Sequence, residues 1–112
     1  MLAGHSDTVP YDDALWQTDP LKLTEVDGRW VGLGSCDMKG GVAVMLAAAV
    51  ELEAPSSDLT WIFYDHEEVD AARNGLGRLS RNRPDLVKAD FAVLMEPTSA
   101  RIEGGCQGTI RV

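Results

Sequence analysis

The sequence predicts an α/β protein with a mixed, largely parallel sheet that is flanked by helices. Apolar runs of strand length alternate along the 112 residues with runs of helical composition, the order of elements that builds a parallel sheet. Hydrophobic residues make up 45% of the chain, enough to form a core. Acidic and imidazole side chains follow the apolar runs, at points where strands are expected to end.

The first half of the chain contains a predicted strand, a hairpin and a helix. Residues 1–4 (MLAG) are a short apolar run, which the glycine and proline of GHSDTVP bring to an end. After a polar, turn-rich loop over residues 11–20, two short runs flank Asp27-Gly28, a dipeptide typical of hairpin turns. Residues 39–54 are rich in Ala, Leu and Met, which predicts a helix that is apolar on most sides and packed deep in the protein.

The second half contains two predicted strands with a weaker helix between them. Residues 59–64 (LTWIFY) form a continuous apolar run, typical of a strand that is covered on both faces. Residues 71–83 have helical character that Gly75 and Gly77 interrupt. Residues 91–95 (FAVLM) predict a second buried strand, closed by Glu-Pro-Thr.

Composition excludes several classes of partner. The chain has 18 acidic and 10 basic residues and a net charge of −8, which argues against binding to nucleic acid or to an anionic membrane surface. Its longest apolar stretch, residues 42–50, is too short to span a bilayer. Two distant cysteines, Cys36 and Cys106, do not suggest a disulfide framework, so we expect a protein of the reducing cytoplasm.

Both ends of the sequence suggest a domain that is truncated. MLAGH has the pattern of the last part of a buried strand, and GGCQGTIRV stops inside a run that looks like a new strand. We therefore expect the chain to be a fragment of a larger protein.

The charged side chains that follow the apolar runs are the candidate functional residues. Ligands of open α/β sheets bind outside the carboxyl ends of the strands, so residues far apart in the chain can meet there. Carboxylates together with imidazole are what a metal-assisted hydrolase needs. The candidates are His5, Glu67, Glu68 and Glu96 just after strands, Asp7 two residues beyond His5, and Asp37 in a glycine-rich turn.

Each candidate also has a purely structural interpretation. His5 is either a metal ligand, whose tautomer Asp7 fixes, or a surface histidine in a turn where Asp7 caps a nearby amide. Asp37 is either a bridge between two cations or the N-cap of the helix that begins near residue 39.

The two adjacent glutamates have a similar choice. On an extended segment Glu67 and Glu68 would point in opposite directions, so that one holds a metal while the other acts on a water. The alternative is a solvated acidic turn. Glu96, before a proline at a strand end, is either a ligand or a turn carboxylate.

Four motifs in this chain resemble, in order and approximate spacing, those of the dinuclear zinc aminoacylase-type metallopeptidase family. They are GHSDTVP, GLGSCDMKGG, FYDHEEVD and MEPT, and the resemblance covers essentially the whole chain. The family includes succinyl-diaminopimelate desuccinylases, acetylornithine deacetylases and dipeptidases. Within it, YDHEEVDAARNGLGRL and EGGCQGTIRV are most similar to actinobacterial succinyl-diaminopimelate desuccinylases.

The resemblance implies a role for each candidate residue. His5 and Glu96 would bind one metal ion, Glu68 the other, and Asp37 would bridge both. Asp7 would orient His5, and the general base would be Glu67. The two ions would be divalent, with zinc expected and cobalt or manganese as alternatives.

The resemblance also implies the reaction and the domain arrangement. The complete protein would hydrolyse N-succinyl-LL-2,6-diaminopimelate to succinate and LL-2,6-diaminopimelate, on the route to diaminopimelate and lysine, and would form a homodimer. Residues 1–103 would belong to the catalytic domain of a zinc peptidase, and residues 104–112 would begin the strand leading to a lid and dimerisation domain. One further ligand, a histidine towards the C-terminus, has no counterpart in this chain, which predicts little activity for the 112 residues alone.

Two alternatives remain open for the function. One is acetylornithine deacetylase or another aminoacylase of the same family, acting on a different N-acyl amino acid. The other is an inactive metal-binding fragment.

Overall fold

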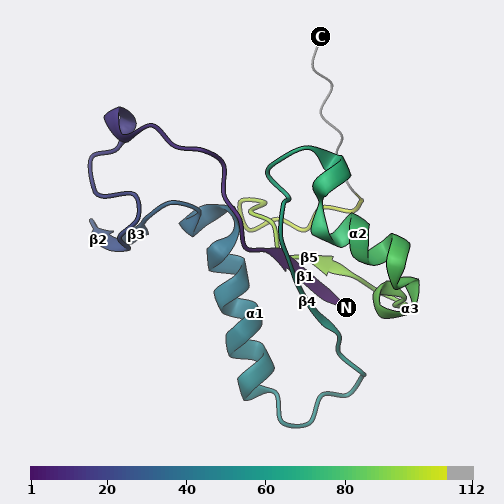
Figure 1. Ribbon diagram of the computed structural model, residues 1–112. Helices are drawn as coiled ribbons and strands as arrows, with labels where there is room; N and C mark the ends of the chain where they lie inside the picture. Colours follow the sequence, from purple (N-terminus) through teal and green to yellow (C-terminus); the bar gives the residue numbers. More distant parts are fainter. Residues whose placement is uncertain (106–112) are drawn as a thin grey trace.

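Three short parallel strands form the sheet that positions the candidate residues, in the order β4-β1-β5 (Figure 1). They were located in a computed structural model, which describes residues 1–105 of the chain. Strand β1 is central: its Leu2 lies opposite Trp61 of β4 on one side and Val93 of β5 on the other. The strands are β1 (Leu2–His5), β4 (Trp61–Tyr64) and β5 (Val93–Leu94).

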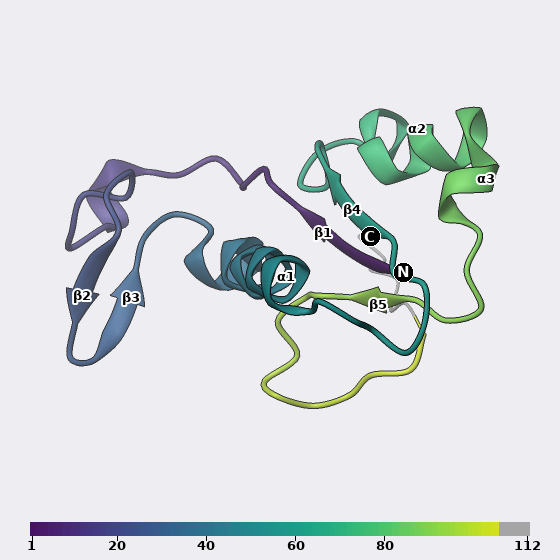
Figure 2. The same ribbon diagram turned by 90° about the horizontal axis from the view of Figure 1, so that it is seen from below.

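Helices lie on both sides of this sheet. Helix α1 (Gly40–Glu51) lies on one side, and α2 (Gly75–Asn82) with α3 (Pro84–Val87) on the other (Figures 1 and 2). Three short helical turns complete the set: η1 (Asp13–Leu15), η2 (Ser35–Lys39) and η3 (Ala71–Arg73). The predicted α/β class with a parallel sheet flanked by helices is therefore confirmed.

The predicted hairpin is present and forms a sheet of its own. Strands β2 (Thr24–Val26) and β3 (Arg29–Val31) pair antiparallel, with Glu25 opposite Trp30. The turn between them places Asp27 at φ 50° and Gly28 at φ 73°, the two positive values that a type I′ turn requires. In Figure 2 the hairpin projects away from the three-stranded sheet.

Helix α1 occupies the predicted residues, but the prediction that it is packed deep is wrong. Only Met45 is buried, whereas Val44, Leu46 and Val50 are 58%, 52% and 82% exposed. The reason is geometric: among the described residues the helix packs mainly against η2, β1 and β4, and these contacts leave most of its side chains exposed. Composition predicted the helix but not how many of its faces find a partner.

The strands on either side of β1 are also less covered than predicted. In β4, Ile62 is buried but Phe63, which points to the other face, is 45% exposed. Strand β5 has only two residues, and Val93 and Leu94 are 37% and 47% exposed. The prediction of two strands buried on both faces is therefore wrong for the described part of the chain.

Helix α2 begins where a break in the helix was predicted. Asn74 caps it, because its side chain accepts a hydrogen bond from the Gly77 amide at 2.9 Å. Gly75 is the first helical residue and is buried. A Cβ at Gly75 would overlap the Asp65 side chain, so the glycine permits a close approach to the end of β4.

The hydrophobic core is small and lies around β1. Its buried apolar members are Ala3, Met38, Met45 and Ile62. The accessible surface is 8873 Å², against roughly 6,000 Å² expected for a compact protein of this mass. The radius of gyration is 15.8 Å, where about 13 Å is expected. Several large apolar side chains, among them Val50 and Phe91, face solvent.

Two sequence-based expectations concern the ends and the membrane. Gly104 and Gly105 lie in no strand, and the remainder of the strand predicted over residues 104–112 falls outside the described residues.

Within residues 1–105, no helix combines the length and the apolar character that a membrane crossing requires.

Candidate metal centre

His5 is the last residue of β1 and is completely buried. Its ring Nδ1 lies 3.1 Å from the backbone carbonyl oxygen of Asp7, and its Nε2 lies 3.1 Å from Asp37 Oδ1. A proton on Nδ1 that is donated to this carbonyl leaves the Nε2 lone pair directed at the carboxylates, the arrangement of a metal-binding histidine. The alternative of a surface histidine is wrong, because the ring is completely buried.

Asp37 does not cap helix α1. The N-cap of that helix is Lys39, and no side-chain hydrogen bond caps the helix. The Asp37 carboxylate instead faces the imidazole of His5, and half of its side-chain surface (54%) remains exposed. Of the two predicted interpretations, the structure therefore excludes the N-cap.

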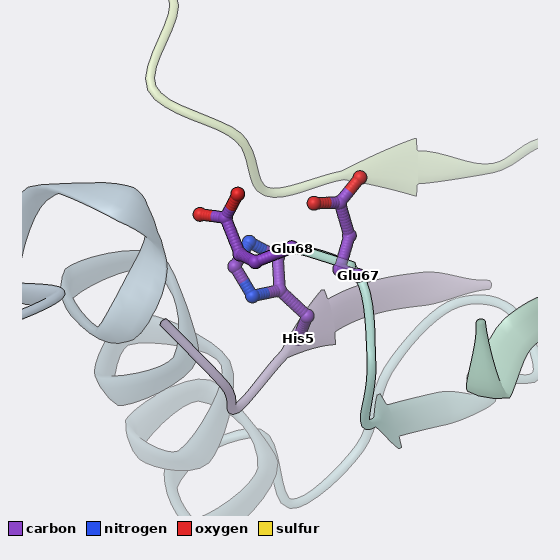
Figure 3. A group of neighbouring side chains, drawn as sticks. All are labelled: His5, Glu67 and Glu68. Carbon is purple, nitrogen blue, oxygen red and sulfur yellow. The ribbon is translucent and has the colours of Figure 1, made fainter. Parts of the chain in front are cut away.

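Glu67 and Glu68 lie in the loop that follows β4, above the ring of His5 (Figure 3). One carboxylate oxygen of each, together with a ring nitrogen of His5, lies within 4.8 Å of the other two atoms. The expectation that the two side chains point in opposite directions is wrong. Strand β4 ends at Tyr64 and His66 adopts φ 58°, so the chain turns and the pair is not on an extended segment.

Glu96 reaches the same place from the third strand. It follows β5, and its Oε1 lies 3.8 Å from His5 Nε2. His5, Asp37 and Glu96 form a second group of ligand atoms that lie within 4.8 Å of one another. The carboxyl ends of β1, β4 and β5, together with the turn before α1 that carries Asp37, thus bring all the predicted ligand residues together around the imidazole of His5.

Asp7 contacts both sides of this cluster. Its carbonyl oxygen is the hydrogen-bond partner of His5 Nδ1, while its carboxylate Oδ1 lies farther from that nitrogen, at 3.5 Å. The carboxylate accepts hydrogen bonds from the backbone amides of Glu67 and Glu68, each at 3.1 Å. The main chain of Asp7 therefore contacts the imidazole, and its side chain contacts the loop that carries the two glutamates.

The cluster brings several carboxylates close together in a partly buried place, where their negative charge is not compensated. Burial, reinforced by neighbouring carboxylates, raises the pKa of Glu68 and of Glu96. Burial alone would lower the pKa of His5, but the hydrogen bond to Asp37 and the charges of Glu96 and Glu67 outweigh it and raise the pKa. A divalent cation would neutralise this charge, and the donor set of imidazole and carboxylates suits zinc, cobalt or manganese.

A cavity of about 290 Å³ opens beside the cluster. Asp37 and Glu68 form part of its wall, so the cavity borders the ligand residues directly. The remaining wall residues were not predicted as site residues, because none of them carries a carboxylate or an imidazole; they are Thr8, Val9, Trp16, Leu33, Gly34 and Cys36. All of them except Trp16 nevertheless lie within the GHSDTVP and GLGSCDMKGG motifs. A larger cavity of about 350 Å³, near the hairpin, includes none of the candidate ligands.

A buried imidazole and four carboxylates at the carboxyl edge of a parallel sheet define an α/β protein with a candidate site for divalent cations. The model of peptidase family M20/M25/M40 matches residues 1–107. The chain therefore belongs to this family of hydrolases.

Similar proteins carry the names of two deacylating enzymes. A Mycobacterium tuberculosis protein, provisionally named succinyl-diaminopimelate desuccinylase DapE, is 49% identical over 112 residues, which is 100% of this chain and 30% of that protein. Succinyl-diaminopimelate desuccinylase of Corynebacterium glutamicum is 44% identical over 115 residues, covering 100% of this chain and 30% of the relative. Acetylornithine deacetylase of Pasteurella multocida is 40% identical over 101 residues, or 90% of this chain and 26% of the relative. The chain thus spans less than a third of the length of these relatives.

Proposed function

We propose that the complete protein is a metal-dependent hydrolase of a linear amide bond in an N-acyl amino acid. The observation that carries this proposal is the convergence of two potential ligand groups on His5, one with Glu67 and Glu68 and the other with Asp37 and Glu96. We assign His5, Asp37, Glu68 and Glu96 as the ligands of two divalent ions, with zinc as the expected metal.

We assign Glu67 as the general base, because it is not one of the four assigned ligands. Bound divalent ions would supply Lewis acidity that lowers the pKa of a water and stabilises negative charge on the amide oxygen. Glu67 accepts the proton of the attacking water and then delivers it to the leaving amine nitrogen. The Asp7 carbonyl holds the ring of His5 so that its Nε2 faces the site.

N-Succinyl-LL-2,6-diaminopimelate is the proposed substrate, because two relatives named as desuccinylases match the whole chain. N-Acetylornithine is the second candidate, supported by the deacetylase that matches 90% of the chain. Kinetics of the complete protein on both substrates would separate them. A kcat/KM at least tenfold higher for the succinylated compound supports the first assignment, and the reverse ratio supports the second.

Three further features belong to the proposal and rest on the sequence. They are a homodimeric complete protein, a cytoplasmic location and the absence of nucleic-acid and membrane partners. The alternative of an inactive metal-binding fragment applies to the 112 residues alone and would be supported by zinc binding without turnover.

The direct test of the catalytic assignment is Glu67→Gln in the complete protein. We expect turnover to fall by at least about 100-fold, since loss of a general base typically costs this much, while zinc remains bound. Glu25→Gln, an exposed glutamate in β2, is the matched control and leaves turnover unchanged. Retention of more than a tenth of the activity in Glu67→Gln would contradict the role as base.

A further inference from the structure

We propose that the loop of residues 65–73, which carries Glu67 and Glu68, is held in place by two clamps, Asp7 on its inner side and Arg78 on its outer side. Both are positioning residues: in the arrangement proposed above, neither side chain touches the metal ions or the substrate. The inference rests on the proposed function for its catalytic consequence, but the clamps themselves follow from hydrogen bonds of this chain.

The inner clamp is the carboxylate of Asp7. One oxygen accepts the amide of Glu67 and the other the amide of Glu68, both at 3.1 Å. Strand β4 ends at Tyr64, so these two amides are beyond its ladder to β1 and find their partner in Asp7 instead. Hydrogen bonds to an ionised carboxylate are roughly twice as strong as neutral ones, so a single side chain fixes two successive peptide units.

Besides these two amides, the carboxylate of Asp7 has one close neighbour that can carry a positive charge among the described residues, the ring Nδ1 of His5 at 3.5 Å. The carboxylate of Asp7 therefore binds mainly to the loop of residues 65–73.

The outer clamp is the guanidinium of Arg78 in α2. Its Nη2 donates to Asp65 Oδ1 at 2.9 Å, and its Nη1 donates to the carbonyl oxygen of Arg73 at 2.8 Å. Asp65 and Arg73 are the first and last residues of the loop, so one planar group joins its two ends. The Gly75 amide adds a bond to the Asp65 carbonyl at 2.8 Å, which closes the base of the loop.

The conformation between the clamps explains why they are needed. His66, directly before the glutamate pair, has φ 58°, in the left-handed region that residues with a side chain seldom adopt. Such a conformation persists when the surrounding contacts impose it. Arg73 Nη2 lies 3.1 Å from His66 Nε2, so the turn is also braced within the loop.

Two substitutions test the clamps in the complete protein. Asp7→Asn keeps the size of the side chain, but its NH₂ group faces an amide that needs an acceptor. Arg78→Met keeps the length of the side chain and removes both donors.

Each variant has a matched control. Asp12→Asn changes another carboxylate that accepts a hydrogen bond from a backbone amide, and Arg83→Met breaks the exposed pair with Asp85.

The first readout is amide hydrogen exchange of Glu67 and Glu68 in the metal-free protein. We expect at least a tenfold loss of protection in Asp7→Asn and a smaller loss in Arg78→Met, with neither control changing it. Unchanged protection in both clamp variants would overturn the proposal. Should Asp7→Asn fail to fold, the exposed Arg78→Met substitution decides alone, because its side chain lies on the surface.

The second readout is the split between kcat and KM. Contacts that orient active-site groups typically contribute 10- to 100-fold, so we expect kcat to fall by about that factor in Asp7→Asn while KM changes little. Arg78→Lys, whose ammonium group reaches only one of the two acceptors, should recover part of the kcat that Arg78→Met loses. A wild-type protein that neither binds zinc nor hydrolyses amides would refute the proposed function, while the exchange data would still decide the clamps. Normal kcat in the presence of lost protection would show that the loop position does not matter for catalysis and would overturn that part of the inference.

Discussion

The Nε2 atom of His5 lies 3.1 Å from Oδ1 of Asp37, although 32 residues separate them in the chain. The contact joins the end of β1 to the turn before α1, and the buried imidazole is the one group that both potential ligand groups share. Because His5 is completely buried and Asp37 is half exposed, the pair links the core to the solvent side of the site.

Removal of the Asp37 carboxylate should lower the pKa of His5. The hydrogen bond to Asp37 is the largest of the effects that raise this pKa, and burial acts in the opposite direction. In Asp37→Ala, NMR titration of the metal-free protein should give a lower His5 pKa than in the wild type. Asp12→Ala, far from the ring, is the control. An unchanged or higher pKa in Asp37→Ala would show that the pair is not formed in solution.

Zinc binding should strengthen as the pH rises. The folded, metal-free protein holds protons on His5, Glu68 and Glu96 more tightly than the unfolded chain, because all three pKa values are raised. Their contribution to stability is therefore present at low pH and lost as the pH rises through the folded values. Zinc must displace these protons.

Calorimetry and thermal unfolding should report this competition. The zinc affinity should rise by at least about tenfold between about pH 5.5 and about pH 7.5, and the increase in Tm on adding zinc should grow in parallel. A zinc affinity independent of pH over this range would argue against His5 as a ligand.

The sequence was sufficient to predict which candidate residues lie close together, because each one follows an apolar run or lies in a glycine-rich turn that is visible locally. Strand ends converge at one edge of a parallel sheet, so the sequence pattern alone was enough to place His5, Glu68 and Glu96 together. The hairpin turn was equally local, since Asp27-Gly28 alone specifies its backbone.

What the sequence could not predict depends on contacts between distant residues. The bonds from the Glu67 and Glu68 amides to Asp7 span 60 and 61 residues, and no local pattern encodes them. The exposure of Val50 was missed for a related reason: an apolar helix predicts burial, but the number of covered faces is set by the elements packed around it.

Truncation of Met45 should test the small core. Its side chain is completely buried, and its Sδ would lie 3.1 Å from a Cβ at Gly4, so α1 and β1 meet there. We expect Met45→Ala to lower the free energy of unfolding by about 2–5 kcal/mol, as for other buried methionines. Leu46→Ala, at a neighbouring site that is 52% exposed, should change it by less than about 0.5 kcal/mol. Urea unfolding of both variants decides, and equal effects would contradict this packing.

Substitution of Gly41 should disturb both the packing of α1 and the candidate metal centre. A Cβ at Gly41 would overlap the backbone oxygen of Met95, the residue directly before Glu96, so Gly41→Ala must push the end of β5 away from α1. We expect a loss of about 1–3 kcal/mol in stability from overpacking. The zinc affinity should fall by about tenfold or more, since Glu96 is displaced from His5.

The control for this prediction is Gly77→Ala, because a Cβ there lies 3.3 Å from the flexible end of Arg81 and meets no backbone. That variant should bind zinc normally and unfold at the same or a slightly higher urea concentration, since alanine favours a helix over glycine. Calorimetry with zinc and urea unfolding measure the two effects separately. If Gly41→Ala bound zinc as tightly as Gly77→Ala, Glu96 would not depend on the contact between α1 and the end of β5, and its assignment as a ligand would lose its structural support.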